Sequence, residues 1–296
     1  VIPSARPPLI SSFGLSICLK SILVPQFVRV TNFVEKFGWK SAKKIIFKEI
    51  HHKFGGSVRT FITGGAPQDP VVAKGLRDFG FNFIQGYGLT ETSPILTLNR
   101  IDNFEDDSAG LPLPSIDLKI NNPDNEGVGE IWAQGPSVML GYYNNEKATQ
   151  EVMQDGWFKT GDIGFIDVDG FLHIRGRKKN VIISKSGKNV FPEEIEDILN
   201  HSPFVLESLV YGEKDLKQDE IIAAQVVVDA EAFIELSEIK DVKITDELIQ
   251  KVISEEVQKA NKQLSGYKQI KKFYIRDQEF EKTTAQKIKR YANQPG

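Results

Sequence analysis

The stretch GYGLTETSP, Gly86–Pro94, combines residue types that are unusual in a packed element. Two glycines flank Tyr87, and a hydroxyl and a carboxylate follow at Thr90 and Glu91. No apolar period runs through the stretch, so neither a helix face nor a strand face accounts for it. An aromatic ring on a flexible backbone, beside hydrogen-bonding groups of the kind that bind phosphate, raises the hypothesis of a ligand site.

A strand–helix–strand unit must position this stretch. Val58–Thr63 reads as a strand, Asp69 as the N-cap of a helix whose first residue is proline, and Phe81–Gln85 as the next strand. Such a crossover makes the two strands parallel, and ligands bind beyond the carboxyl ends of parallel strands. GGAP (Gly64–Pro67) follows the first strand and GYGLTE follows the second, so we expect both glycine-rich turns to open onto the same edge.

The flanking segments show two different patterns. Apolar residues four apart over residues 33–54, such as Ile46 and Ile50, predict an amphipathic helix that stops at a Gly-Gly pair. From about residue 101 to 175, short alternating runs between Pro, Asn and Gly turns predict a β-rich subdomain with a hairpin turn at Asp167–Gly170.

Strands and helices mix again in the last part of the chain. A helix opened by Pro192, strands near 205–211 and 220–228, a long helix from Thr245 to about Leu264 and a strand at 270–276 predict an α+β domain. The expected fold class is therefore α/β plus α+β, with a partial large domain followed by a smaller, mobile C-terminal domain. We expect its parts to span residues 1–100 (α/β), 101–175 (β-rich) and 176–296 (α+β).

The composition is that of an ordinary globular protein, with 40% hydrophobic and 26% charged residues among 296. The single Cys18 excludes an internal disulfide framework and a cysteine cluster for zinc, which fits the cytoplasm. Residues 1–60 carry ten Lys or Arg against two acids, but a solvated helix face explains such a segment best, so we predict no nucleic-acid partner. Gly14 and Pro25 interrupt the apolar stretch near the start, which favours buried core over a membrane span.

Five motifs follow one another along the chain. They are GGAP, GYGLTE, WFKTGD (Trp157–Asp162), RGRKKNVIISKSGKNVFPEEIE (Arg175–Glu196) and KTTAQKIKR (Lys282–Arg290). Each motif alone is weak evidence for a function, since Gly-Gly pairs and proline at a helix start mark turns and helix ends in many unrelated proteins. Together and in this order they resemble the adenylate-forming (AMP-binding) superfamily of acyl-CoA synthetases, luciferases and peptide-synthetase adenylation domains. The resemblance is strongest to bacterial long-chain fatty acid–CoA ligases.

The resemblance implies a reaction in two halves. The carboxylate of a fatty acid attacks the α-phosphate of ATP to give acyl-AMP and pyrophosphate, and the thiol of coenzyme A then displaces AMP. Because negative charge builds on phosphate oxygens during adenylation, hydrogen-bond donors, a cation and Mg²⁺ should stabilise it. ATP or AMP, Mg²⁺ and coenzyme A are therefore the expected small molecules.

The same resemblance assigns roles to single residues. Tyr87 is expected to stack on adenine, Thr90 to bond phosphate oxygens as a catalytic residue, and Glu91 to help hold Mg²⁺. Asp162 is expected to accept both ribose hydroxyls, and Arg177 to reach ribose and phosphate, an ordinary hairpin-end salt bridge being the alternative for this arginine. The small residues expected to let the backbone approach the nucleotide are Gly64, Gly65, Ala66, Gly86 and Gly88.

Three further residues belong to the C-terminal motifs. Lys287 occupies the position of the catalytic lysine, whose ammonium bridges the attacking carboxylate and the α-phosphate, although Gln286 stands where the family usually has glycine. Lys179 matches the hinge about which the C-terminal domain rotates between the half-reactions. Gly187 is expected to leave the coenzyme A channel open.

One family feature is missing from the sequence. No Ser/Thr/Gly-rich phosphate loop ending in lysine occurs between Val1 and Thr63, so we expect this chain to be the later portion of a longer enzyme. An N-terminal half of the large domain would then be absent, and activity of the isolated chain is in doubt. Two alternatives stay open, adenylation of an aryl or amino acid and a non-catalytic AMP-binding remnant. Fatty substrates and the basic opening segment also suggest peripheral contact with the inner membrane face.

Overall fold

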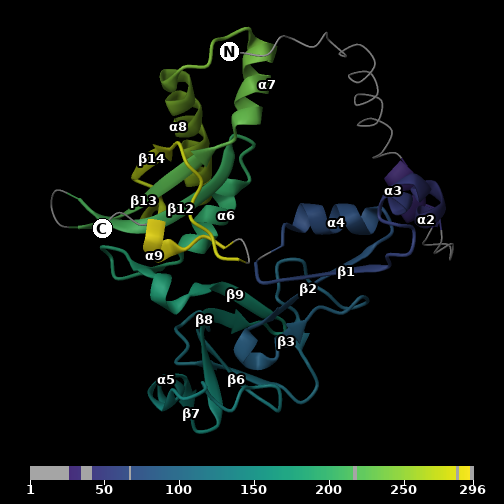
Figure 1. The fold of residues 1–296 in the computed structure, drawn as a ribbon, viewed down its shortest axis with the longest axis vertical. Coiled ribbons are helices and arrows are strands. Elements are labelled where there is room, and N and C mark those ends of the chain that lie inside the picture. The colour runs from purple at the N-terminus through teal and green to yellow at the C-terminus, as the bar shows by residue number, and fades with distance from the viewer. Residues whose placement is uncertain (1–26, 35–41, 67, 216–218, 285–286, 294–296) are drawn as a thin grey trace. The chain divides into compact units, whose positions relative to one another are not determined.

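The computed structural model describes residues 27–34, 42–66, 68–215, 219–284 and 287–293 (Figure 1). Contacts divide them into two compact units. The first holds the described residues up to Leu118 with Ala133–Phe158 and Ile166–His173. The second holds Lys119–Trp132, Lys159–Phe165 and the described residues from Ile174 onward. This division does not follow the chain in order, whereas the three expected domains do, and their boundaries stay a prediction.

A four-stranded sheet in the first unit carries the opening motifs. Its strands β1 (Thr60–Gly64), β2 (Asn82–Gly88), β3 (Ile95–Leu98) and β4 (Leu111–Pro112) lie in sequence order. β1 and β2 are parallel, and the other pairs are antiparallel. The predicted crossover is confirmed.

Helix α4 (Pro70–Asp78) makes this crossover, and Figure 1 shows it alongside β1 and β2. Asp69 is its N-cap, because its side chain accepts hydrogen bonds from the amides of Val71 and Val72. Proline at the first helical position loses no intrahelical bond there, which makes this start readable from sequence.

The helix predicted over residues 33–54 is confirmed in the described residues 42–53, where it has one irregular residue and ends before the Gly-Gly pair. Helices α2 (Ala42–Ile46) and α3 (Lys48–Lys53) are separated at Phe47, and residues 35–41 lie outside the described residues. Phe47 is buried and its ring meets Phe79 edge-on at 5.1 Å, whereas Ile46 is 41% exposed. The four-residue spacing therefore did not mark the buried face. Helical hydrogen bonds continue across Phe47, since its amide donates to the Lys43 carbonyl at 2.8 Å and the His51 amide donates to the Phe47 carbonyl at 3.0 Å.

A second, five-stranded sheet corresponds to the predicted β-rich segment. Its path is β5 (Asp117–Asn121), β6 (Gly129–Gln134), β8 (Trp157–Ile166) and β7 (Met153–Gln154), with β9 (Leu172–Arg177) paired to β8. Helix α5 (Glu146–Val152) precedes β7. The predicted hairpin turn between β8 and β9 is confirmed, since Asp167 Oδ1 accepts the amides of Asp169 and Phe171, both at 2.9 Å.

The C-terminal part forms a three-stranded sheet. Its strands β12 (Val205–Lys214), β13 (Glu220–Val228) and β14 (Lys272–Arg276) lie in that order, the first pair antiparallel and the second parallel. Helices α6 (Pro192–Asn200) and α8 (Asp246–Gln263) pack together, and α6 also packs on β12. The remaining elements here are β10 (Ile182–Ile183), β11 (Asn189–Val190), α7 (Ala230–Lys240) and α9 (Arg290–Asn293).

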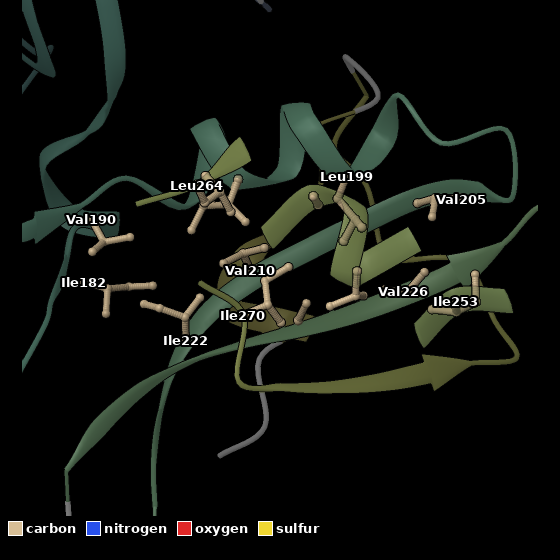
Figure 2. Packing of buried hydrophobic residues seen from close by; sticks show 14 of the residues in the cluster. Ile182, Val190, Leu199, Val205, Val210, Ile222, Val226, Ile253, Leu264 and Ile270 are labelled. Carbon is tan, nitrogen blue, oxygen red and sulfur yellow. The ribbon is translucent and has the colours of Figure 1, made fainter. Parts of the chain in front are cut away.

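One apolar cluster joins α6 and α8 to the strands of this sheet. Figure 2 shows side chains from α6, α8 and the strands meeting in one layer, among them Leu199, Val210, Val226 and Ile253, none more than 1% exposed. Burial of such side chains contributes about 1.5–3 kcal/mol each relative to exposure, so this unit has a core of its own. Among the described residues, none of the helices combines the length and apolar character that a membrane crossing requires.

Candidate nucleotide-binding site

The GGAP motif begins at the carboxyl end of β1. Gly64 is the last residue of the strand and lies opposite Gly86 of β2. A Cβ atom on Gly64 would lie 3.1 Å from the Gly86 carbonyl oxygen, so the two backbones approach closely. Gly65 follows with φ +88°, a conformation that favours glycine, and Ala66 is exposed. Pro67 lies outside the described residues.

The glycines of GYGLTE correct one expectation. Gly86 and Gly88 lie within β2 and not in a turn after it, and each pairs with β3. A Cβ atom on Gly88 would lie 1.8 Å from the carbonyl oxygen of Pro94, and one on Gly86 would lie 2.9 Å from Leu98 Cδ1. The close approach of β3 therefore requires both glycines, independently of any ligand.

The turn after β2 places the hydroxyl and the carboxylate of this motif. Thr90 is exposed at the start of a short 3₁₀ turn, Thr90–Thr92. The buried Thr92 hydroxyl accepts the Leu89 amide at 3.0 Å and lies 2.9 Å from the carbonyl oxygens of Leu89 and Pro94, to one of which it donates. Thr92 thus fixes the turn that presents Thr90, a role the sequence prediction missed. The available signal was Thr-x-Thr-Ser-Pro, Thr90–Pro94, after two glycines.

Tyr87 and Glu91 are both held by neighbours in the first unit. The half-buried Tyr87 packs against the small cluster of Leu96, Ile116 and Ala133. Glu91 Oε1 accepts the phenol of Tyr142 at 3.0 Å, and its carbonyl accepts the amide of Met139 at 2.8 Å. The carboxylate predicted to bind Mg²⁺ is therefore oriented by a tyrosine that sequence reasoning did not single out.

Asp162 and Arg177 come together across the β8–β9 hairpin. Arg177 Nη1 donates to Asp162 Oδ1 at 2.7 Å and to the carbonyl oxygen of Thr160 at 3.0 Å. The Asp162 side chain is 10% exposed and that of Arg177 is 40% exposed. Arg177 therefore forms the hairpin-end salt bridge considered as the alternative, and the same bond orients the carboxylate predicted to bind ribose.

The backbone between these two residues is also fixed. The buried Thr160 hydroxyl donates to the carbonyl oxygen of Ile131 at 2.8 Å and accepts the amide of Asp162 at 3.1 Å. Gly161 has φ +72°, which an L-residue adopts only at a cost of about 1–2 kcal/mol. The Thr-Gly-Asp motif thus sets the direction of the Asp162 side chain through its two preceding residues.

The predicted hinge and channel residues lie at the surface of the second unit. Lys179 is exposed in the 3₁₀ turn Lys178–Asn180 that follows β9. Gly187 is exposed with φ +75° in the β10–β11 turn, where its amide donates to the Ser184 carbonyl at 2.8 Å. No atom lies within 4 Å of a Cβ placed on Gly187, so its turn requires glycine for conformation and not for space.

Lys287 is exposed on a narrow loop between β14 and α9. The amide of Thr283 donates to the Lys287 carbonyl at 2.8 Å, and the amide of Lys287 donates to Thr283 Oγ1 at 3.2 Å. Lys282 and Ile288 form an antiparallel bridge just outside this pair. The loop closes on itself and presents Lys287, while Gln286, the departure from the family pattern, lies outside the described residues.

A cluster of three titratable side chains lies beside the β8–β9 turn. His173 Nε2 is 2.8 Å from Asp167 Oδ2 and 3.7 Å from Glu105 Oε2, and its Nδ1 is 3.2 Å from the carbonyl oxygen of Asp107. Their ligand atoms lie close enough to hold a cation. An imidazolium that donates from both nitrogens also satisfies all of these contacts, so the cluster reads as an ion pair that closes the hairpin.

The predicted residues divide between the two units. Those of GGAP and GYGLTE belong to the first, whereas Asp162, Arg177, Lys179, Gly187 and Lys287 belong to the second. Within each unit the structure gives each predicted residue a defined place, and it pairs Gly64 with Gly86 and Asp162 with Arg177.

Two family models match this chain. The AMP-binding enzyme model matches residues 21–143, and the AMP-binding enzyme C-terminal domain model matches residues 194–287. A long-chain-fatty-acid–CoA ligase, FadD15 of Mycobacterium bovis, is 34% identical over 261 residues, which are 83% of this chain and 42% of that protein. A feruloyl-CoA synthase of Amycolatopsis sp. is 41% identical over 178 residues, 58% of this chain and 36% of that protein. The chain spans less than half the length of these curated relatives.

The structure of this chain is also similar to that of a solved CoA synthetase. The o-succinylbenzoate CoA synthetase (MenE) of Bacillus subtilis, in complex with the acyl-adenylate intermediate OSB-AMP, matches with a TM-score of 0.69 and 30% identity over 81% of this chain and 46% of that one. The same enzyme has been solved with ATP and a magnesium ion (TM-score 0.65, 30% identity, 79% and 46% coverage). The expected α/β plus α+β fold class is confirmed. The chain belongs to the AMP-binding enzyme family and is similar to bacterial long-chain fatty acid–CoA ligases.

Proposed function

We propose that this chain is part of an enzyme that activates a long-chain fatty acid with ATP to acyl-AMP and then transfers the acyl group to coenzyme A. The observation that carries this proposal is the Arg177–Asp162 pair at 2.7 Å. A nearly buried carboxylate with a fixed direction can accept both hydroxyls of one ribose, because an ionised carboxylate offers about four lone-pair sites.

In the adenylation half-reaction, a carboxylate oxygen of the acid forms a bond to the α-phosphorus of ATP and the bond to pyrophosphate breaks. Thr90 would donate a hydrogen bond to phosphate oxygens, and the Lys287 ammonium would stabilise negative charge on the acid and the α-phosphate. In the second half-reaction, the sulfur of coenzyme A bonds to the acyl carbon and AMP leaves. Asp162 and Arg177 would hold the nucleotide through both steps.

Glu91 has the chemistry that Mg²⁺ requires. It offers a carboxylate oriented by the Tyr142 phenol, and Mg²⁺ is usually bound by one or two carboxylates together with substrate phosphates. When bound, the ion would offset the charge on the phosphate oxygens. The complex of the Bacillus subtilis enzyme with ATP and a magnesium ion supports Mg²⁺ as a cofactor, and Glu91 is our proposal for its ligand.

The acid class is supported by the relatives. The fatty acid ligase matches 83% of this chain, which favours a fatty acid. An aryl acid is the second candidate, because the feruloyl-CoA synthase is 41% identical to this chain over a shorter stretch of 178 residues. Binding of AMP without turnover is the third reading, and the test below separates all three.

The test is acid-dependent release of pyrophosphate by the full-length protein that the gene encodes, with a long-chain fatty acid, with ferulic acid and without acid. We expect release with the fatty acid and little with ferulate. The reverse order would replace the fatty acid by an aryl acid. AMP binding in calorimetry with no release for any acid would contradict an enzymatic function.

A further inference from the structure

The loop that carries Lys287 is anchored on its N-terminal side to strand β12. The amide of Phe280 donates to Glu207 Oε1 at 2.8 Å, and Lys282 Nζ lies 2.8 Å from Glu207 Oε2. The Glu207 side chain is only 12% exposed and Phe280 is buried. The chain entering the loop is therefore held at one carboxylate by a main-chain and a side-chain contact.

On the other side of the loop, three residues after Lys287, Arg290 makes a stronger attachment. Its Nη1 donates to the carbonyl oxygen of Val210 at 2.9 Å, and its Nη2 lies 2.5 Å from Glu196 Oε2. Glu196 Oε1 in turn accepts the amide of the same Val210 at 2.6 Å. One guanidinium, one carboxylate and the main-chain amide and carbonyl of one residue thus close a ring that joins α9, α6 and β12.

The chemistry of this ring favours a single geometry. The side chains of Arg290 and Glu196 are 17% and 14% exposed, so water competes little with the bond between them. Glu193, one helical turn earlier on α6, adds an oxygen 3.5 Å from Arg290 Nη2. Replacing this planar guanidinium removes two hydrogen bonds as well as the charge, because its two donors point at two different acceptors.

Between the two anchors, the described residues of the loop bond mainly to one another and to the Asn293 side chain of α9, which contacts both main-chain groups of Glu281. The amide of Lys289 donates to the Glu281 carbonyl, and Lys287 and Thr283 exchange the bonds described above. Among the described residues, the exposed Lys287 ammonium forms no ion pair. The position of that ammonium therefore depends on where the two ends of the loop are held.

We propose that Arg290, held by Glu196 and the Val210 carbonyl, is a positioning residue that sets the place of the Lys287 ammonium during adenylation. The proposal rests on the function proposed above for Lys287. A misplacement of about 1 Å at a reacting centre can lower a rate by roughly 10²-fold, so a distant anchor can matter for the chemistry.

The test compares Arg290→Met, which keeps the length of the side chain but removes the fork, with Lys268→Met. Lys268 is the matched control because it pairs with Glu194 of the same helix at 2.7 Å, with side chains 18% and 28% exposed. The other contact of its ammonium in the described residues is with the Tyr267 ring. Arg290→Lys keeps the charge without the fork. All variants are made in the full-length protein, and all measurements are done at pH 8.

The first readout is hydrogen exchange at the amides of Thr283, Lys287 and Lys289, which needs no activity. We expect it to be at least 10-fold faster in Arg290→Met, intermediate in Arg290→Lys and unchanged in Lys268→Met. Unchanged exchange in Arg290→Met would overturn the proposal. Loss of protection throughout the C-terminal sheet in both Arg290 variants would also overturn it, because the ring would then be a folding element.

The second readout separates the half-reactions. ATP–pyrophosphate exchange should fall by about 10–100-fold in Arg290→Met, whereas thioester formation from supplied acyl-AMP should change by less than about threefold. Faster amide exchange with unchanged adenylation would show that Arg290 holds the loop. It would contradict the proposed role of Lys287 in adenylation, and with it the positioning role of Arg290. Equal losses in both half-reactions would contradict a positioning role in adenylation. A wild-type protein without adenylation would contradict the proposed function, and the amide exchange would still decide whether Arg290 holds the loop.

Discussion

The Arg177 guanidinium lies 2.7 Å from the Asp162 carboxylate across the β8–β9 hairpin, and the Asp162 side chain is 10% exposed. The bond to Arg177 fixes the orientation of the Asp162 carboxylate. The carboxylate oxygens can still accept further hydrogen bonds. A salt bridge that looks structural is thus compatible with a binding role, because it prepares the acceptor before a ligand arrives.

Asp162→Asn tests that role. The amide has nearly the same shape but accepts at one oxygen only and carries no charge, so hydrogen bonds to ribose should weaken by about 1.5–3 kcal/mol. We expect AMP to bind about 10–100-fold more weakly in calorimetry. Asp117→Asn, at an exposed position of β5, is the control and should bind AMP as the wild type does. Equal affinity in the two variants would remove Asp162 from the nucleotide site.

Gly161→Ala tests the backbone that directs this carboxylate. The left-handed φ of +72° should lower the free energy of unfolding by about 1–2 kcal/mol, measured by denaturant titration. Gly266→Ala is the matched control in the same unit, since its φ lies outside the left-handed range and nothing lies within 4 Å of an added Cβ. If Gly161→Ala lowers the free energy of unfolding no more than the control does, the strand relaxes around residue 161.

Tyr142→Phe tests the orientation of Glu91. Loss of the 3.0 Å hydrogen bond frees the carboxylate to rotate, and loss of such outer partners commonly weakens metal binding by 10–100-fold. We expect the Mg²⁺ concentration for half-maximal ATP-dependent activity to rise by about 10-fold. The neighbouring Tyr143, 93% exposed, supplies the control Tyr143→Phe. An unchanged Mg²⁺ requirement would mean that the phenol does not orient a metal ligand.

Glu196 should make stability depend on pH. Burial raises its pKa to about 7, although Arg290 and the Val210 amide oppose the rise. Because the folded pKa lies above the unfolded one, the contribution of this group is fully present below pH ~4.5 and is lost as the pH rises to about 7. In the wild type, the free energy of unfolding should therefore fall by at most roughly 3 kcal/mol between these pH values because of Glu196. Glu196→Gln should not show this fall. Parallel pH profiles of unfolding free energy for both proteins would contradict the raised pKa.

Local chemistry made part of the fold predictable. The β1–α4–β2 crossover was readable because Asp69 and Pro70 mark a helix start and the flanking strands are short apolar runs. The long helix α8 was readable for the same reason, since Thr245 caps it through the amide of Leu248.

Other parts depended on contacts between distant residues. Phe47 is buried against Phe79, 32 residues later, a contact that no local spacing reveals. Helix α7 was missed because its apolar residues do not gather on one face. Among site residues, the motif resemblance supplied Asp162 and Arg177, but the Glu196–Arg290 bond joins residues 94 apart and is invisible to any pattern of spacing.

The parallel pairing of β13 with β14 bears on how the protein is made. Ala223 and Lys272 lie side by side in the sheet, yet helices α7 and α8 must be synthesised between them. A growing chain on the ribosome therefore completes this sheet only after Arg276 has emerged. The loop with Lys287 is made later still, so the group proposed to take part in the chemistry finds its support on β12 only after the sheet itself is complete.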